Sequence, residues 1–183
     1  MKGGGVEGGN VWAPWRIEYV RGPKTRGCVF CAALAAGADR DHLVLHRGER
    51  AFVILNRYPY TAGHLMVVPN RHAAGLEDLG DAEAAELWRL AVRSRGALQA
   101  ALRPEGYNLG LNLGAAAGAG VRDHLHLHVV PRWVGDTNFM PVLGSVRVIS
   151  QHLTEIYDSL APWFAAGSGA PKPAAGRDPC SPS

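Results

Sequence analysis

The segment Asp123-His-Leu-His-Leu-His-Val-Val-Pro131 places three histidines at every second position. Successive side chains of a β-strand point to opposite faces, so these imidazoles would share one face, roughly 6–7 Å apart along the strand. The leucines between them would then face the core. Burying three imidazoles without partners costs several kcal/mol. We therefore expect His124, His126 and His128 to form a catalytic face, a metal-binding face, or both.

A glycine- and alanine-rich segment, Gly114-Ala-Ala-Ala-Gly-Ala-Gly120, comes just before the histidines. Small residues let backbone N–H groups approach an anion closely, so Gly118, Ala119 and Gly120 are candidates for binding phosphate. An ordinary flexible connection is the alternative. No Gly-Lys-Ser/Thr follows, so this is not a Walker A loop. A histidine beside a phosphate-binding loop suggests nucleophilic attack on phosphorus.

Two cysteines are spaced as Cys28-Val-Phe-Cys31. Such a pair provides half of a tetrahedral zinc site, a redox pair, or no function at all. Three cysteines cannot form a disulfide framework, and in a chain with no export signal the spacing favours metal or redox chemistry. The third, Cys180, lies in a glycine-, serine- and proline-rich end segment, and we expect no role for it.

Short β-like runs must position these residues, together with one long helix. Asp81 can cap that helix, whose apolar residues recur every three or four positions until Pro104 stops it. A last helix is predicted over residues 151–165, and strands over 42–46, 51–55, 64–69, 107–112 and 124–131. Consecutive strands joined by short turns favour an antiparallel sheet with the long helix packed on it. The predicted fold class is α+β.

The composition indicates one globular domain, since 47% of the 183 residues are hydrophobic and 19% are charged. We expect residues 1–10 to be flexible, 11–166 to form the domain and 167–183 to be disordered. No apolar run approaches the ~20 residues of a membrane span, and no hydrophobic leader follows the first residue. The net charge of +3 comes without alternating basic and aromatic residues. We therefore expect a cytoplasmic protein that binds neither membrane nor nucleic acid.

The histidine segment resembles the signature of the histidine-triad (HIT) superfamily, His-φ-His-φ-His-φ-φ with φ apolar. Further segments are similar to the bacterial diadenosine-polyphosphate phosphorylase and hydrolase branch: residues 12–19, 28–31, 55–60, 63–69 and 130–140. The resemblance covers roughly residues 11–165. It implies a HIT-like fold, with about five antiparallel strands, one long helix and a C-terminal helix. It also implies a homodimer.

The resemblance implies a role for each histidine. His126 would be the nucleophile that attacks the α-phosphorus, and the resulting adenylyl-histidine divides one hard displacement into two easier ones. His128 would donate a hydrogen bond to a non-bridging phosphate oxygen and stabilise the charge of the transition state. His64 resembles the family's fourth histidine, which supports the triad, although a surface role at a strand edge is the alternative.

Two asparagines match family positions that bind the nucleotide. Asn56 matches the residue that contacts ribose, with a structural turn role as the alternative, and Asn112 matches the polar residue that leads into the phosphate loop. One stretch departs from the family pattern. Family members often carry Ser, Thr or Gln between the glycines and the triad, whereas Ala119-Gly-Val-Arg-Asp123 has none. Whether water or inorganic phosphate is the second acceptor is therefore open.

Some histidine-triad proteins complete a cysteine pair with two histidines. The matching residues are His72 and His124, so the resemblance implies a structural zinc on Cys28, Cys31, His72 and His124 that fastens the N-terminal segment to the sheet. No organic cofactor is expected.

The implied function is cleavage of a dinucleoside polyphosphate, with diadenosine tetraphosphate as the expected substrate, by phosphorolysis or hydrolysis through a nucleotidyl-histidine. A nucleoside phosphoramidase or an adenylyl-sulfate-cleaving enzyme on the same fold is the alternative. Two further hypotheses belong to other classes. One is a non-catalytic nucleotide-binding module, against which the complete triad argues; the other is a zinc storage or structural protein, which leaves the glycine loop unexplained.

Overall fold

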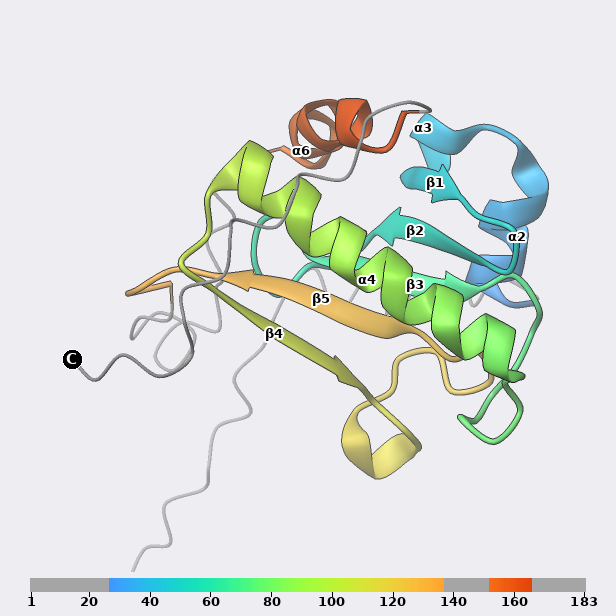
Figure 1. The fold of residues 1–183 in the computed structure, drawn as a ribbon. Helices are drawn as coiled ribbons and strands as arrows, with labels where there is room; N and C mark the ends of the chain where they lie inside the picture. The colour runs from blue at the N-terminus through green and yellow to red at the C-terminus, as the bar shows by residue number, and fades with distance from the viewer. Residues whose placement is uncertain (1–26, 137–151, 166–183) are drawn as a thin grey trace, which may run out of the picture.

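The computed structural model describes residues 27–136 and 152–165. Five strands form one antiparallel sheet in the order β1-β2-β3-β5-β4 (Figure 1). They are β1 (Val44–Arg47), β2 (Ala51–Leu55), β3 (Leu65–Pro69), β4 (Gly106–Leu111) and β5 (Leu127–Arg132). The strand that carries the end of the histidine segment, β5, therefore lies inside the sheet between β3 and β4, while β1 and β4 are the edges.

Strands β2 and β3 form the centre of the core. Every residue of both strands is buried, so their apolar runs are continuous rather than alternating. They pair in register from Ala51 opposite Pro69 to Leu55 opposite Leu65. The predicted hairpin between β1 and β2 is confirmed, with the Gly48 N–H donating to the Ala51 carbonyl across the turn.

Helix α4 (Asp81–Leu102) crosses one face of the sheet (Figure 1). Its buried side includes Leu87, Leu90, Ala91 and Leu98, as the apolar spacing predicts. The capping prediction is wrong by one position. Gly80 is the N-cap, because the Glu83 carboxylate accepts the Gly80 N–H at 2.9 Å and Asp81 is already helical. The helix ends as predicted, with Arg103 in the left-handed region before Pro104.

Two short helices precede the sheet, α2 (Val29–Ala36) and α3 (Asp39–His42), and neither was expected. The predicted strand over residues 42–46 is therefore wrong at its start. His42 ends α3, Leu43 takes a left-handed conformation with φ 62°, and β1 begins only at Val44. The predicted start of β5 is also too early, because the Leu125 N–H donates to the Ala73 carbonyl of a loop and pairing with β3 begins at Leu127.

The C-terminal helix α6 (Leu153–Leu160) continues into a short 3₁₀ turn, Ala161–Trp163. It buries Ile156 and Leu160, and the Tyr157 hydroxyl donates to the Val44 carbonyl of β1. The predicted α+β class, with one long and one C-terminal helix, is confirmed. No helix of the described residues is long and apolar enough to cross a membrane. The end segments 1–10 and 167–183, Cys180 and residues 137–140 lie outside the described part, and the domain boundaries stay predictions.

Candidate active site and metal centre

The histidine segment buries all three of its imidazoles. The exposed fractions are 1% for His124, 6% for His126 and 8% for His128, and the intervening Leu125 and Leu127 are buried as well, with Leu127 in the hydrophobic core. Buried polar side chains need hydrogen-bond partners. The partners of each ring therefore define what each ring can do.

His64 supports His128 directly. The His64 Nε2 lies 2.9 Å from the His128 Nδ1, and the His64 Nδ1 lies 3.1 Å from the Tyr60 backbone nitrogen. A backbone N–H can only donate, so the Nδ1 of His64 accepts and its Nε2 carries the proton. His64 then donates to the Nδ1 of His128, and the proton of neutral His128 sits on Nε2. That nitrogen is buried and has no hydrogen-bond partner among the described residues. His128 therefore holds an unused donor, as a phosphate-binding role requires.

His126 is oriented by the backbone of its own segment. Its Nδ1 lies 2.9 Å from the His124 carbonyl oxygen, which can only accept. The Nδ1 therefore carries the proton, and the lone pair of the neutral ring lies on Nε2. Burial lowers the pKa of His126 below its usual value of 6.5, which favours this neutral, nucleophilic form.

Burial also dominates the electrostatics of His128. It lowers the pKa of that ring to about 4, and the neighbouring His126 contributes in the same direction. The two rings meet edge to face with centroids 4.9 Å apart. Both imidazoles are therefore neutral at pH 7, one presenting a lone pair and the other an N–H.

Asn56 and Tyr60 complete the support of His64. The Asn56 Nδ2 lies 3.3 Å from the His64 Nδ1, and its Oδ1 accepts the Tyr58 N–H at 2.9 Å. The structural turn role of Asn56 is thus present, and its contact with ribose stays a prediction. The ring of Tyr60 packs 4.6 Å from that of His64. Sequence reasoning missed Tyr60, although it lies within the segment 55–60 that resembles the family.

The glycine-rich loop leads from β4 to the histidines. Gly114 and Gly118 both have φ of +78°, a conformation that favours glycine, and they bracket a 3₁₀ turn over Ala115–Ala117. Ala119 is buried. Asn112 follows β4 and lines, with Gly114, Arg122 and His124, a cavity of about 270 Å³. Phosphate binding by Gly118, Ala119 and Gly120 stays a prediction.

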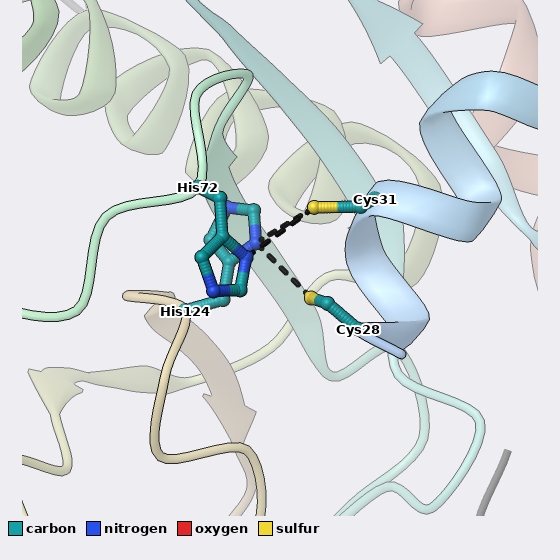
Figure 2. A group of neighbouring side chains, drawn as sticks. All are labelled: Cys28, Cys31, His72 and His124. Carbon is teal, nitrogen blue, oxygen red and sulfur yellow. Dashed lines mark hydrogen bonds between the residues drawn. The ribbon is translucent and has the colours of Figure 1, made fainter. Parts of the chain in front are cut away.

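Four predicted metal ligands come together beside the triad (Figure 2). Ligand atoms of Cys28, Cys31, His72 and His124 all lie within 4.8 Å of one another. The His124 Nδ1 is 3.2 Å from the Cys28 Sγ and 3.6 Å from the Cys31 Sγ, and the His72 Nδ1 is 3.4 Å from the Cys31 Sγ. Three separate parts of the chain thus supply this group: the start of α2, the loop after β3 and the histidine segment.

The chemistry of this group fits a metal ion. The His124 Nε2 donates to the Pro69 carbonyl at 2.9 Å, so the Nδ1 that faces the cysteines carries the lone pair. Two sulfurs and two nitrogens match a tetrahedral site. Burial and the adjacent Cys28 raise the pKa of the Cys31 thiol, so a metal must displace protons to bind. The group can hold a metal.

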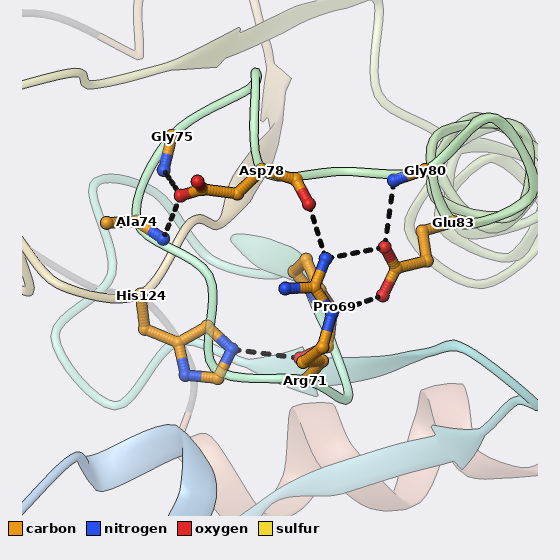
Figure 3. A network of polar contacts seen from close by, with 8 residues as sticks. All are labelled: Pro69, Arg71, Ala74, Gly75, Asp78, Gly80, Glu83 and His124. Atoms are coloured by element: carbon orange, nitrogen blue, oxygen red, sulfur yellow. Dashed lines mark hydrogen bonds and ion pairs between the residues drawn. The ribbon is translucent and has the colours of Figure 1, made fainter.

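A polar network holds the loop that carries His72 (Figure 3). Arg71 forms an ion pair with Glu83 of α4 at 2.8 Å and also donates to the Asp78 carbonyl. The Asp78 carboxylate accepts the N–H groups of Ala74 and Gly75. The loop is therefore fixed on both sides of His72 before any metal binds.

The buried histidine row that leads into the interior strand β5, with its supporting histidine, matches a known class of domain. Residues 38–134 match the family model described as HIT domain, and the chain belongs to the HIT family. An AP-4-A phosphorylase of Mycobacterium tuberculosis is 41% identical over 163 residues, which are 85% of this chain and 84% of the relative. These findings confirm the family and fold predicted from the sequence, and with them the prediction of a nucleotide-processing enzyme.

Solved structures show the same architecture. A Zn-bound histidine triad family protein from Mycobacterium smegmatis is 31% identical with a TM-score of 0.61, over 75% of this chain and 93% of that one. A hypothetical histidine triad nucleotide-binding protein from Sulfolobus tokodaii is 27% identical with a TM-score of 0.55, over 75% of this chain and 89% of that one.

Proposed function

We propose that this protein cleaves dinucleoside polyphosphates, with diadenosine tetraphosphate as substrate, through a nucleotidyl-histidine on His126. The observation that carries the proposal is the pair of complementary rings. His126 presents a lone pair on Nε2 because its Nδ1 donates to the His124 carbonyl, and His128 presents an unpartnered N–H because its Nδ1 accepts from His64. The similarity to an AP-4-A phosphorylase supports the choice of substrate.

The chemistry needs no proton removal from the nucleophile. The Nε2 of His126 attacks the α-phosphorus, an N–P bond forms, and the P–O bond to the leaving nucleoside polyphosphate breaks. The Nε2–H of His128 donates to a non-bridging oxygen as charge grows there. An acceptor then attacks the same phosphorus, breaks the N–P bond and restores His126. From diadenosine tetraphosphate, the first step releases ATP.

We propose inorganic phosphate as the acceptor, so that the second product is ADP; with water it would be AMP. The glycine-rich loop supports this choice, because its backbone N–H groups suit an anion. The name of the M. tuberculosis relative supports it as well. The absence of a hydroxyl side chain near Gly120 argues for water, which is the alternative.

We propose that the metal is zinc and that its role is structural, holding the start of α2 on the histidine segment. The Cys₂His₂ donor set supports zinc, and so does the Zn-bound relative from M. smegmatis. Zinc there would hold Cys28 and Cys31 as thiolates and take no part in the bond changes at phosphorus.

Product analysis tests the function. Purified protein is given diadenosine tetraphosphate with and without inorganic phosphate, and nucleotides are separated by chromatography. ATP and ADP with phosphate confirm phosphorolysis, whereas AMP as the only other product at saturating phosphate identifies a hydrolase. Parallel assays with a nucleoside phosphoramidate and adenylyl sulfate test the alternative enzymes. Binding without turnover of any of these would identify a nucleotide-binding module.

We also propose that the protein acts as a homodimer, as the family resemblance implies. Among the residues that the structure describes, strand β4 has one neighbour in the sheet and pairs with nothing along its other edge. Trp88 and Val92, one turn apart on α4, are 55% and 68% exposed. Both features support an interface with a second copy. Location in the cytoplasm stays a prediction.

A further inference from the structure

Phe30 lies between the two cysteines of the metal group and contacts two histidines of the triad. Its side chain is buried, and its ring lies 5.5 Å from that of His124, edge to face at 82°, and 5.1 Å from that of His126. The segment that supplies two metal ligands therefore also packs an aromatic ring against the proposed nucleophile.

Helix α2 begins at the metal group, while Arg47 of β1 donates to the Ala33 and Leu34 carbonyls further along the helix. It has eight residues, too few for stability on its own, and its N-cap has no side-chain hydrogen bond. Cys28 is that N-cap and Cys31 lies in the first turn, so both candidate metal ligands lie at the end of the helix that carries Phe30. A metal bound to both cysteines and to His124 fixes Phe30 relative to the histidine segment.

The ring of His126 is thus held at two points. One is its Nδ1, which donates to the carbonyl of His124, itself a metal ligand. The other is the ring itself, which packs against the ring of Phe30 at an interplanar angle of 48°. A ring held at one nitrogen only can still rock about that hydrogen bond, and the packed aromatic restricts this motion.

We propose that Phe30 is a positioning residue that couples the metal centre to His126: the metal fixes the start of α2, and Phe30 holds the imidazole with its Nε2 toward the substrate phosphorus. The effect on turnover rests on the function proposed above, because it requires His126 to be the nucleophile. The effect on the ring itself does not. An aromatic residue that merely filled the core would be replaceable by an aliphatic one.

The test compares two substitutions within the same segment. Phe30→Leu keeps an apolar side chain but removes the ring, whereas Val29→Ala changes a residue that is 41% exposed. Both proteins are purified zinc-loaded and their metal content is measured. The Nδ1–H of His126 is followed by ¹H–¹⁵N NMR, and its resonance is assigned by its loss in His126→Asn.

We expect Phe30→Leu to retain metal, to exchange this proton faster with water, and to lose about 10- to 100-fold in kcat with KM changed less. Val29→Ala should match the wild type in all three measurements.

Metal removal from the wild-type chain provides a second measurement if Phe30→Leu does not fold or loses its metal. Chelation should speed the exchange of the His126 Nδ1–H, and added zinc should restore the slow exchange. An unchanged resonance in metal-retaining Phe30→Leu, or after chelation of the wild type, overturns the inference. A wild-type enzyme that cleaves no nucleotide overturns the proposed function instead, and the NMR comparison still decides the positioning role.

Discussion

At the scale of single residues, backbone groups that cannot titrate fix the histidine tautomers. The Tyr60 N–H, which only donates, sets the proton positions of His64 and then of His128, and the His124 carbonyl, which only accepts, sets that of His126. Each neutral ring therefore has one allowed proton position. The site presents one lone pair and one N–H, and none of the hydrogen bonds that set them involves a carboxylate. Backbone groups, rather than charged side chains, thus decide which ring donates and which ring accepts.

Replacing His126, the proposed nucleophile, should abolish turnover and leave nucleotide binding largely intact. For His126→Asn we expect kcat to fall on the order of 10⁴-fold or more, because the covalent route is lost. The Kd for a non-cleavable substrate analogue should change little. Rates from quenched-flow assays and circular dichroism of the variant check this. A near-normal kcat in His126→Asn would exclude the covalent mechanism.

Loss of the unpartnered N–H of His128 should lower kcat less than loss of His126 does. His128→Ala removes one hydrogen bond that strengthens in the transition state, so we expect kcat to fall about 10²–10³-fold. His128→Gln, which can still accept from His64, should keep the fold closer to wild type. Steady-state kinetics of both variants provide the measurement. An effect confined to KM would show that His128 binds the ground state only.

The depressed pKa of His128 makes stability dependent on pH. The folded-state pKa is about 4, against a usual value of 6.5. Below pH 6.5 the unfolded chain gains a proton that the folded ring resists, so stability falls as pH falls and this contribution levels off near pH 4. The loss is at most about 3 kcal/mol. Denaturant unfolding from pH 8 to 4 should show a shallower decline in His128→Gln; equal slopes in both proteins would contradict the assignment.

At the scale of elements, the group of Cys28, Cys31, His72 and His124 brings together the start of α2, the loop after β3 and the histidine segment. Cys28→Ser should lower both the zinc content, expected to be about one per chain, and the melting temperature, because metal binding contributes to folding. Cys180→Ser, which changes the cysteine outside the predicted domain, is the matched control and should change neither. Metal analysis and thermal unfolding provide the data. Wild-type protein that contains no zinc after purification without chelator would contradict the proposed zinc site.

The sequence predicts the elements with strong local patterns and misses those that tertiary contacts define. The apolar runs of β2 and β3 and the periodicity of α4 suffice for their assignment. Helices α2 and α3 are too short for a clear period, and the reversal at Leu43 needs a left-handed conformation that leucine rarely adopts. The family pattern predicts which four residues form the metal group. The packing of Phe30 on His126 joins residues 96 positions apart along the chain, and no local pattern encodes it.

At the scale of the whole molecule, the two edges of the sheet have different neighbours in the part of the chain that the structure describes. The β1 edge lies near α3, whereas β4 pairs with β5 alone among the described strands. The Tyr107 hydroxyl of β4 donates to the Arg95 carbonyl of α4, so the open strand and the long helix lie next to each other. Leu109 on β4 is 43% exposed. An open strand edge beside exposed apolar residues favours pairing with another chain.

A two-fold dimer would bring this surface against its own copy, because the same patch then serves both partners. Sedimentation equilibrium should give a mass near twice the 19.5 kDa of the chain. Val92→Glu places a charge on the exposed face of α4 and should shift the protein to monomer, since two copies of the glutamate would be brought together without a partner. Val92→Thr changes polarity at the same position with similar size and no charge, and should leave the dimer intact. A wild-type monomer at micromolar concentration, or a Val92→Glu dimer, would place any interface elsewhere than on this helix.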